Sequence, residues 1–162
     1  MLEKAYLPSP FGCFEIKGSR LGLHTVRLTD KKRCPDLPVP AVLLKAHQQL
    51  GEYFAGKRQD FELELDYGDA PDFHRAVWEE LRKVPYGHTT TYLAIATTLG
   101  DPHAVRAVGQ ANRHNPLAIV VPCHRCIAKS GDLQGYFYGL DMKRQLLELE
   151  NPASFARQGS LF

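Results

Sequence analysis

The sequence predicts a mixed α/β protein, built from a small N-terminal α/β domain and a mainly helical C-terminal domain. Residues 1–70 alternate between strand-like and helix-like segments, whereas the chain from Asp72 onward carries apolar side chains mostly at helical spacing. A stretch rich in turn-forming residues, 67–71, separates these two patterns. We therefore expect domains at residues 1–70 and 71–151, followed by a loosely ordered tail at residues 152–162.

The N-terminal domain has three predicted strands. Residues 1–4 lead into a turn-rich stretch, and short strands follow at residues 14–16 and 21–26, on either side of a turn at residues 18–20. Residues 61–65 alternate apolar and acidic side chains, which predicts a strand with one buried face.

The same domain has one predicted helix, at residues 40–54. A loop with three prolines, residues 30–40, precedes it, and Gly56 ends it. Its apolar side chains recur at the spacing of one helical face: Val42, Leu43, Ala46, Leu50 and Phe54.

The C-terminal domain is expected to be mostly helical. Asp72 is a plausible N-cap for its first helix, which carries Phe73, Val77, Trp78 and Leu81. Short helices at residues 91–99 and 102–112, joined by a Gly-Asp turn, have the proportions of a helix-turn-helix. The second of these would be the recognition helix, and Asp141 begins a last helix.

The composition is that of an ordinary soluble globular protein, with 44% hydrophobic residues, 23% charged residues and a net charge of +2. No apolar run approaches the roughly 18 residues of a transmembrane helix, and the N-terminus lacks the apolar core of a signal peptide. We therefore expect a cytoplasmic protein with no membrane partner. Because cytoplasmic thiols are kept reduced, we expect no disulfide among Cys13, Cys34, Cys123 and Cys126.

A nucleophile candidate follows the apolar run of residues 117–121, which predicts a buried strand. The run ends in Pro122-Cys123-His124-Arg125, where a histidine and an arginine directly follow the cysteine. Cysteine is a strong nucleophile only as the thiolate, and basic neighbours raise the thiolate fraction. A buried structural cysteine is the alternative. The C-x-x-C formed with Cys126 leaves a redox or zinc site open, although no second ligand pair shows a suitable spacing, so we assign no metal.

The charge is unevenly distributed around this motif. Residues 102–131 contain no Asp or Glu but include four basic residues: Arg106, Arg113, Arg125 and Lys129. A local positive segment in a nearly neutral chain is expected for a limited contact with a polyanion, and an ordinary basic surface is the alternative.

Several motifs in fixed order resemble the O6-alkylguanine-DNA alkyltransferases. They are Gly87-x4-Tyr92, Arg106-Ala107-Val108-Gly109, Asn115-Pro116, Ile119-Val120-Val121-Pro122-Cys123-His124-Arg125, Gly135-Tyr136, Gly139, Lys143 and Leu146-Leu147-x2-Glu150. The resemblance runs from about Asp72 to Glu150, and the N-terminal half is similar only in length and α/β pattern. It implies a ribonuclease H-like N-terminal domain and a winged-helix-like, helix-turn-helix DNA-binding domain.

The resemblance also implies a reaction and its residues. Cys123 would take a methyl or alkyl group from O6-alkylguanine in double-stranded DNA and keep it as a thioether, so each protein molecule would act once. His124 would remove the thiol proton through a water, and Glu150 would orient His124. Tyr92 would assist the guanine leaving group by a hydrogen bond, and Asn115 would brace the turn before the cysteine. No cofactor and no partner subunit is implied, and O4-alkylthymine is a second candidate substrate.

DNA contacts and a substrate pocket follow from the same resemblance. Arg106 would fill the gap left by a nucleotide flipped out of the duplex, with the recognition helix in the minor groove. The other expected DNA contacts are Ala107, Gly109, Arg113 and Arg125, and the expected pocket residues are Tyr136, Tyr138, Val121 and Pro122. Tyr138 replaces a glycine found in many members, so we expect a pocket that disfavours bulky adducts.

Other functions remain open at this point. A non-enzymatic sensor of DNA lesions on the same scaffold is the main alternative, although such relatives lack the reactive cysteine that this chain has at position 123. A DNA-binding regulator and a thiol-redox or zinc protein are the remaining possibilities.

Overall fold

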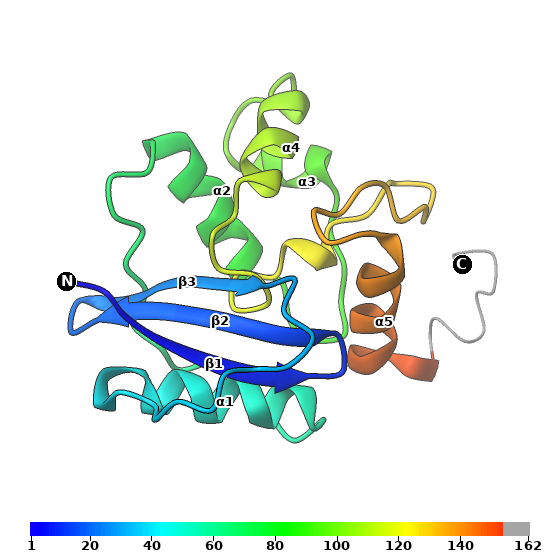
Figure 1. Ribbon diagram of the computed structural model, residues 1–162. Helices are drawn as coiled ribbons and strands as arrows, with labels where there is room; N and C mark the ends of the chain where they lie inside the picture. Colours follow the sequence, from blue (N-terminus) through cyan, green and yellow to red (C-terminus); the bar gives the residue numbers. More distant parts are fainter. Residues whose placement is uncertain (154–162) are drawn as a thin grey trace. The chain divides into compact units, whose positions relative to one another are not determined.

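The computed structural model describes residues 1–153, and the chain forms two compact units (Figure 1). Unit 1 contains residues 1–69 and the short segment 116–120. Unit 2 contains residues 70–115 and the chain from Val121 on. Most of the expected tail, residues 154–162, lies outside the described residues.

Unit 1 is built on a three-stranded antiparallel sheet in the order β1-β2-β3. The strands are β1 (Glu3–Ser9), β2 (Gly12–Ser19) and β3 (Gly22–Leu28). β1 was not predicted, because Pro8 and the turn residues that follow it obscure a short alternation in which Ala5 and Leu7 are the buried positions. These two side chains lie opposite Ile16 and Phe14 of β2, which completes the apolar face of the sheet.

Helix α1 (Leu44–Phe54), preceded by the 3-10 turn η1 (Ala41–Leu43), covers this apolar face. The ring of Phe54 lies 5.2 Å from that of Phe14, and the Leu7 side chain reaches Gly51 of α1. Figure 1 shows α1 running along one side of the sheet. The predicted helix was therefore correct, and its first turn is a 3-10 turn.

Two of the predicted strands do not form regular strands. Residues 61–65 alternate between half-buried and exposed side chains, but only Leu65 bridges the sheet, beside Leu23. In the apolar run of residues 117–121, Leu117 bridges Val26 and the chain then turns, with Ile119 at φ 72°. The run is buried as expected, yet hydrophobicity alone does not distinguish a strand from a buried turn.

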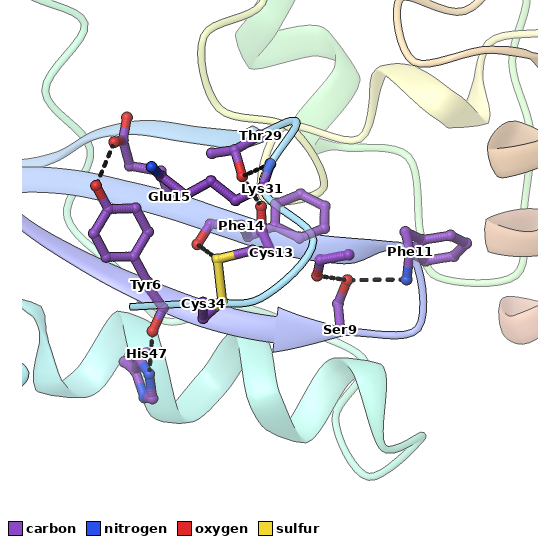
Figure 2. Close-up of a disulfide and its surroundings, with 11 residues drawn as sticks. Tyr6, Ser9, Phe11, Cys13, Phe14, Glu15, Thr29, Lys31, Cys34 and His47 are labelled. Atoms are coloured by element: carbon purple, nitrogen blue, oxygen red, sulfur yellow. Dashed lines mark hydrogen bonds between the residues drawn. A yellow bond between two sulfur atoms is a disulfide. The ribbon is translucent and has the colours of Figure 1, made fainter. Parts of the chain in front are cut away.

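A disulfide joins Cys13 of β2 to Cys34 in the loop before η1, contrary to the expectation that no disulfide forms (Figure 2). Thr29 supports the same loop, because its amide and its hydroxyl both donate to the Cys13 carbonyl, at 2.9 and 2.7 Å. The expectation rested on the compartment, and the sequence contains no signal for how close these two residues lie in the fold.

Unit 2 is helical. Its elements are α2 (Asp72–Arg82), α3 (Tyr92–Thr98), α4 (Val105–Arg113), the 3-10 turn η2 (Cys123–Arg125) and α5 (Leu140–Glu150). Asp72 is the first residue of α2 and not its N-cap, a position that Pro71 occupies without a side-chain bond. Thr91 caps α3 by accepting from the Ala94 amide, and α2 is tied to α4 where Trp78 Nε1 donates to the Ala111 carbonyl at 2.8 Å.

Helices α3 and α4 contact each other as the predicted helix-turn-helix, with Gly100 in the turn at φ 91°. Among the described residues, no helix has the length and hydropathy required to cross a membrane.

Removing the disulfide should destabilise unit 1. The Cys13–Cys34 link closes a loop with a sequence separation of 21, so Cys34→Ser should lower the free energy of unfolding by about 3 kcal/mol through the entropy returned to the unfolded chain. Urea denaturation without reductant measures this loss, and wild-type protein in reductant should reproduce it. Equal wild-type midpoints with and without reductant would contradict the link.

Candidate active site

The turn that carries Cys123 is fixed on both sides. Upstream, the Val121 carbonyl accepts from Asn115 Nδ2 and from the Cys123 amide, both at 2.8 Å. Downstream, Thr90 forms a bridge in which its amide donates to the Arg125 carbonyl and its carbonyl accepts from the Ile127 amide. Cys123 as a residue is only 6% exposed, so these hydrogen bonds hold a nearly buried cysteine in place.

A buried carboxylate organises the two residues after Cys123. His124 Nε2 donates to Glu150 Oε2 at 2.7 Å, and Arg125 donates to both oxygens, from Nε at 2.8 Å and from Nη2 at 3.1 Å. Burial alone would raise the pKa of Glu150, but these hydrogen bonds and the neighbouring positive charge outweigh burial and hold its pKa well below the ordinary range. Glu150 is therefore an anion at neutral pH.

His124 is a neutral imidazole with one free basic nitrogen. Its side chain is fully buried, and this burial, together with the charges of Arg125 and Lys143, lowers its pKa although Glu150 raises it. Because Nε2 donates to Glu150, the proton is on Nε2 and the lone pair is on Nδ1. Nδ1 is buried and has no hydrogen-bond partner within residues 1–153. This nitrogen is thus available to accept a proton.

Burial raises the pKa of the Cys123 thiol, and a hydrogen bond from Asn115 and the Lys143 charge offset only part of that increase. The resting side chain is therefore a thiol, and it needs a base to become a nucleophile. Asn115 has two tasks here, since its amide both braces the Val121 carbonyl and lies beside the sulfur.

Tyr92 starts α3 and packs against α4. Its ring lies 3.4 Å from where a Cβ would lie on Gly109, so the Tyr92 ring packs directly against this turn of α4. Burial raises the pKa of the Tyr92 phenol, which keeps it protonated and able to donate a hydrogen bond.

The expected DNA-contact residues fall into two groups. On α4, Arg106, Ala107 and Arg113 are exposed, whereas Gly109 faces Tyr92. Arg125 is not at the surface as expected: it is 6% exposed, and besides Glu150 its guanidinium bonds the Val84 carbonyl at 2.7 Å. Arg125, which we expected to contact DNA, is therefore bonded inside unit 2.

The expected pocket residues lie in two places: just before η2 and in the loop that precedes α5. Val121 and Pro122 are buried beside Cys123. Tyr136 and Tyr138 contact each other edge to face, with ring centroids 5.7 Å apart, and the Tyr136 hydroxyl is buried with no partner in the described chain. Burial raises the pKa of Tyr136 well above its ordinary value, so this phenol stays protonated and can donate a hydrogen bond to a bound substrate.

Lys143 is a site residue to which the sequence analysis gave no role. It is fully buried, and its ammonium donates to the carbonyls of Cys126, Leu133 and Gly135. Burial lowers its pKa to about 8. Lys143 lies on the same face of α5 as Met142 and Leu146, and this helical spacing could have indicated that the lysine points inward.

The two cysteines of the C-x-x-C pattern are not joined to each other. Cys123 and Cys126 are both free thiols, and burial raises the pKa of Cys126 to about 12. Among residues 1–153, no group of three or more His, Cys, Asp or Glu side chains is arranged to hold a metal ion.

Comparison with known proteins covers both units. Residues 2–67 match the model "6-O-methylguanine DNA methyltransferase, ribonuclease-like domain", and residues 72–152 match "6-O-methylguanine DNA methyltransferase, DNA binding domain". A methylated-DNA–protein-cysteine methyltransferase of Mycolicibacterium paratuberculosis is 45% identical over 161 residues, covering 95% of this chain and 97% of the relative. The Mycobacterium tuberculosis O6-methylguanine methyltransferase structure superposes with a TM-score of 0.82 at 42% identity and covers 94% of both chains. A structure from the same organism in complex with DNA gives 0.81 at 43% identity and 91% coverage of both chains.

Replacing the buried carboxylate should change stability and its pH dependence. Glu150→Gln leaves Arg125 without its counter-charge and should cost about 3–5 kcal/mol at pH 7. The folded pKa of Glu150 lies below its unfolded value, so the carboxylate contributes stability above about pH 4.5 that is lost as the pH falls.

The free energy of unfolding of Glu150→Gln should therefore decrease less than that of wild type between about pH 5 and pH 3. Denaturant titrations across this range measure it. Glu148→Gln, on the same helix, is the matched control and should follow wild type. If the free energy of unfolding of Glu150→Gln falls as steeply as that of wild type between about pH 5 and pH 3, the role of this carboxylate is contradicted.

Proposed function

Because the chain belongs to the 6-O-methylguanine DNA methyltransferase family, we propose that Cys123 is the residue that accepts the alkyl group from O6-alkylguanine in DNA. The activity of the protein is direct-reversal DNA repair, in which an alkyl group passes from DNA to a protein cysteine. The observation that carries the assignment is the buried His124–Glu150 pair beside a buried free thiol.

The transfer forms one bond and breaks one. The Cys123 sulfur attacks the alkyl carbon, an S–C bond forms and the bond from that carbon to guanine O6 breaks. The thiol proton passes through a water to Nδ1 of His124, the buried nitrogen that has no partner in the described chain. The imidazolium that results is stabilised by the Glu150 carboxylate, as in other nucleophile–base–acid arrangements. The thioether is stable, so each molecule acts once.

Guanine leaves with negative charge on its ring, and a hydrogen bond to a ring nitrogen lowers the barrier. Tyr92 is our candidate donor, because burial keeps its phenol protonated and its position against Gly109 fixes the ring. The unpartnered, buried hydroxyl of Tyr136 is the second donor that can meet the substrate base.

A base inside a duplex cannot reach a buried thiol, so the damaged nucleotide must be flipped out. We assign Arg106 to the gap it leaves, with α4 in the minor groove and Ala107 and Arg113 beside the backbone. Arg125 is reassigned from the DNA to Glu150, as a residue that positions the carboxylate. We also propose that the protein acts in the cytoplasm, as a monomer, and that O4-alkylthymine is a further substrate.

Labelled DNA tests the acceptor. With duplex DNA carrying methyl-labelled O6-methylguanine, we expect one label per protein molecule, located on Cys123 by peptide mass spectrometry. Cys123→Ala should take up none, whereas Cys126→Ser, at the other free thiol, should still be labelled. DNA binding by wild type without any transfer would instead support the lesion sensor.

Adduct size tests the pocket. Tyr138 puts a large ring in contact with Tyr136, so wild type should transfer methyl faster than benzyl, and Tyr138→Gly should raise the benzyl rate more than the methyl rate. Single-turnover rates on matched duplexes measure both, and Phe137→Gly, at the neighbouring exposed ring, is the control. Equal benzyl-to-methyl ratios in wild type and Tyr138→Gly would refute the idea.

A further inference from the structure

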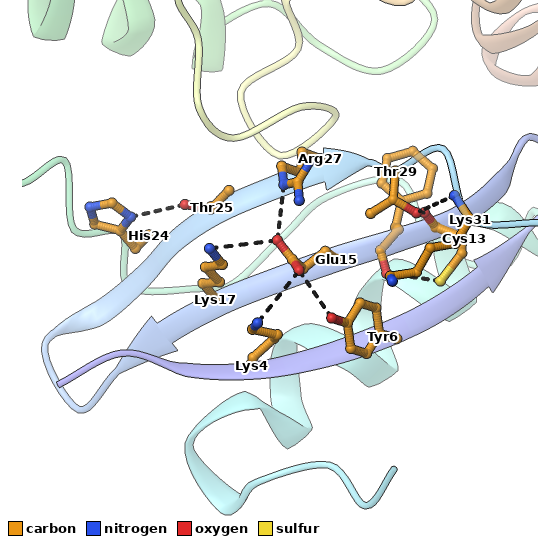
Figure 3. A network of polar contacts seen from close by, with 11 residues as sticks. Lys4, Tyr6, Cys13, Glu15, Lys17, His24, Thr25, Arg27, Thr29 and Lys31 are labelled. Carbon is orange, nitrogen blue, oxygen red and sulfur yellow. Dashed lines mark hydrogen bonds and ion pairs between the residues drawn. The ribbon is translucent and has the colours of Figure 1, made fainter. Parts of the chain in front are cut away.

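One face of the sheet in unit 1 is lined by long polar side chains (Figure 3). Lys4 of β1 and Lys17 of β2 are directly opposite each other. In the next row, Glu15 of β2 lies between Tyr6 of β1 and Arg27 of β3. This is the face opposite the one that α1 covers, because side chains alternate along each strand.

Glu15 is the centre of this face. Its side chain is 5% exposed, and Arg27 Nε donates to it at 2.9 Å, with the Lys17 and Lys4 ammonium groups at 3.6 and 3.9 Å. The Tyr6 hydroxyl donates to it at 3.2 Å. Burial would raise the pKa of Glu15, but Arg27, Tyr6 and Lys17 together hold it below its ordinary value. One carboxylate is therefore shared by three cations.

A fourth cation comes from the loop that the disulfide holds. Lys31 Nζ lies 5.9 Å from the centroid of the Tyr6 ring, a cation–π distance. The hydrogen bonds of Thr29 and the Cys13–Cys34 link fix this loop to β2 on both sides of Lys31 (Figure 2). We call Lys4, Lys17, Arg27 and Lys31, gathered around Glu15, the basic face.

Folding does not require this much positive charge. Like charges directly opposite each other across two strands are destabilising, and Lys4 lies opposite Lys17. A single cation satisfies Glu15, and Arg27 already makes the shortest ion pair with it. Glu15 is the only carboxylate that the three strands place on this face, so their three cations exceed it by two positive charges. Lys4 and Arg27 remain about half exposed, so this charge faces solvent.

We propose that the basic face binds the sugar–phosphate backbone of duplex DNA, as a contact separate from helix α4. The inference rests on the proposed function, which supplies DNA as the partner. A face dominated by lysine and arginine side chains suits phosphates, whereas charged residues are depleted from the core of protein interfaces. Such contacts carry no sequence information, as suits a repair protein whose lesions occur anywhere.

Salt dependence of DNA binding tests the proposal. Lys4→Gln/Lys31→Gln removes two charges of the basic face and leaves Arg27 and Lys17 to pair with Glu15, so the sheet stays intact. Lys45→Gln/Lys57→Gln removes two exposed charges from α1 and the chain just after it and is the matched control. Fluorescence anisotropy with an undamaged duplex, at several salt concentrations, gives the affinity and its slope for each full-length protein.

If both lysines contact phosphates, the log–log salt slope should become shallower by about 1.8, and affinity should fall about fivefold per contact at 0.15 M salt. The control should match wild type. Glu15→Gln removes the negative charge and should tighten binding. If the cations serve only Glu15, or an acidic protein, both double variants will have equal slopes and the proposal is overturned.

Label transfer from damaged duplex DNA, at protein and DNA concentrations that saturate binding, separates this outcome from a failure of the proposed function. All variants of the basic face should still place one label on Cys123. If Lys4→Gln/Lys31→Gln has the same salt slope as wild type but label transfer is intact, only the DNA contact of the basic face is refuted. If wild type transfers no label, the assignment of Cys123 is refuted.

Discussion

The active-site region depends on one buried carboxylate. Glu150, at the end of α5, binds His124 and Arg125, the two residues that follow the nucleophile candidate. A carboxylate inside a protein is costly unless it is paired and hydrogen-bonded, and here both oxygens are bonded. That pairing sets the tautomer of His124, the orientation of η2 and the charge beside the thiol.

Close backbone approaches make this arrangement possible. A Cβ on Gly87 would lie 3.2 Å from the Glu150 carbonyl, and its φ of 81° also favours glycine. Asn151 fixes the same junction by donating to the Gly87 carbonyl at 2.9 Å. Gly109 of α4 packs against the Tyr92 ring at an ordinary contact distance. The segment from Gly87 to Tyr92, which includes the Thr90 bridge to Cys126, therefore connects the Glu150 end of the site to Tyr92, our proposed hydrogen-bond donor.

Some of this could be predicted from the sequence and some could not. Helical periodicity predicted α1 and the helices of unit 2, because apolar spacing reports directly on which face is buried. The pairing of His124 with Glu150, 26 positions apart, came only from family resemblance, since no local pattern reports a contact between distant residues. The same limit explains why the disulfide was missed.

The errors in charge assignment have a common cause. Arg125 and Lys143 were counted as surface charges or left without a role, although both are buried and bonded, one to a carboxylate and one to carbonyls. Sequence reasoning treats basic residues as exposed by default. Conversely, the basic face of unit 1 was not recognised, because its cations lie on different strands and only the sheet register brings them together.

The central claim is that Glu150 holds His124 as a neutral imidazole with Nδ1 free to take the thiol proton. Nitrogen-15 NMR of the histidine side chains measures this directly. At pH 7 the account predicts a His124 ring protonated at Nε2 and unprotonated at Nδ1, with the Nε2 proton in a strong hydrogen bond. A ring protonated at Nδ1, or at both nitrogens, would contradict it.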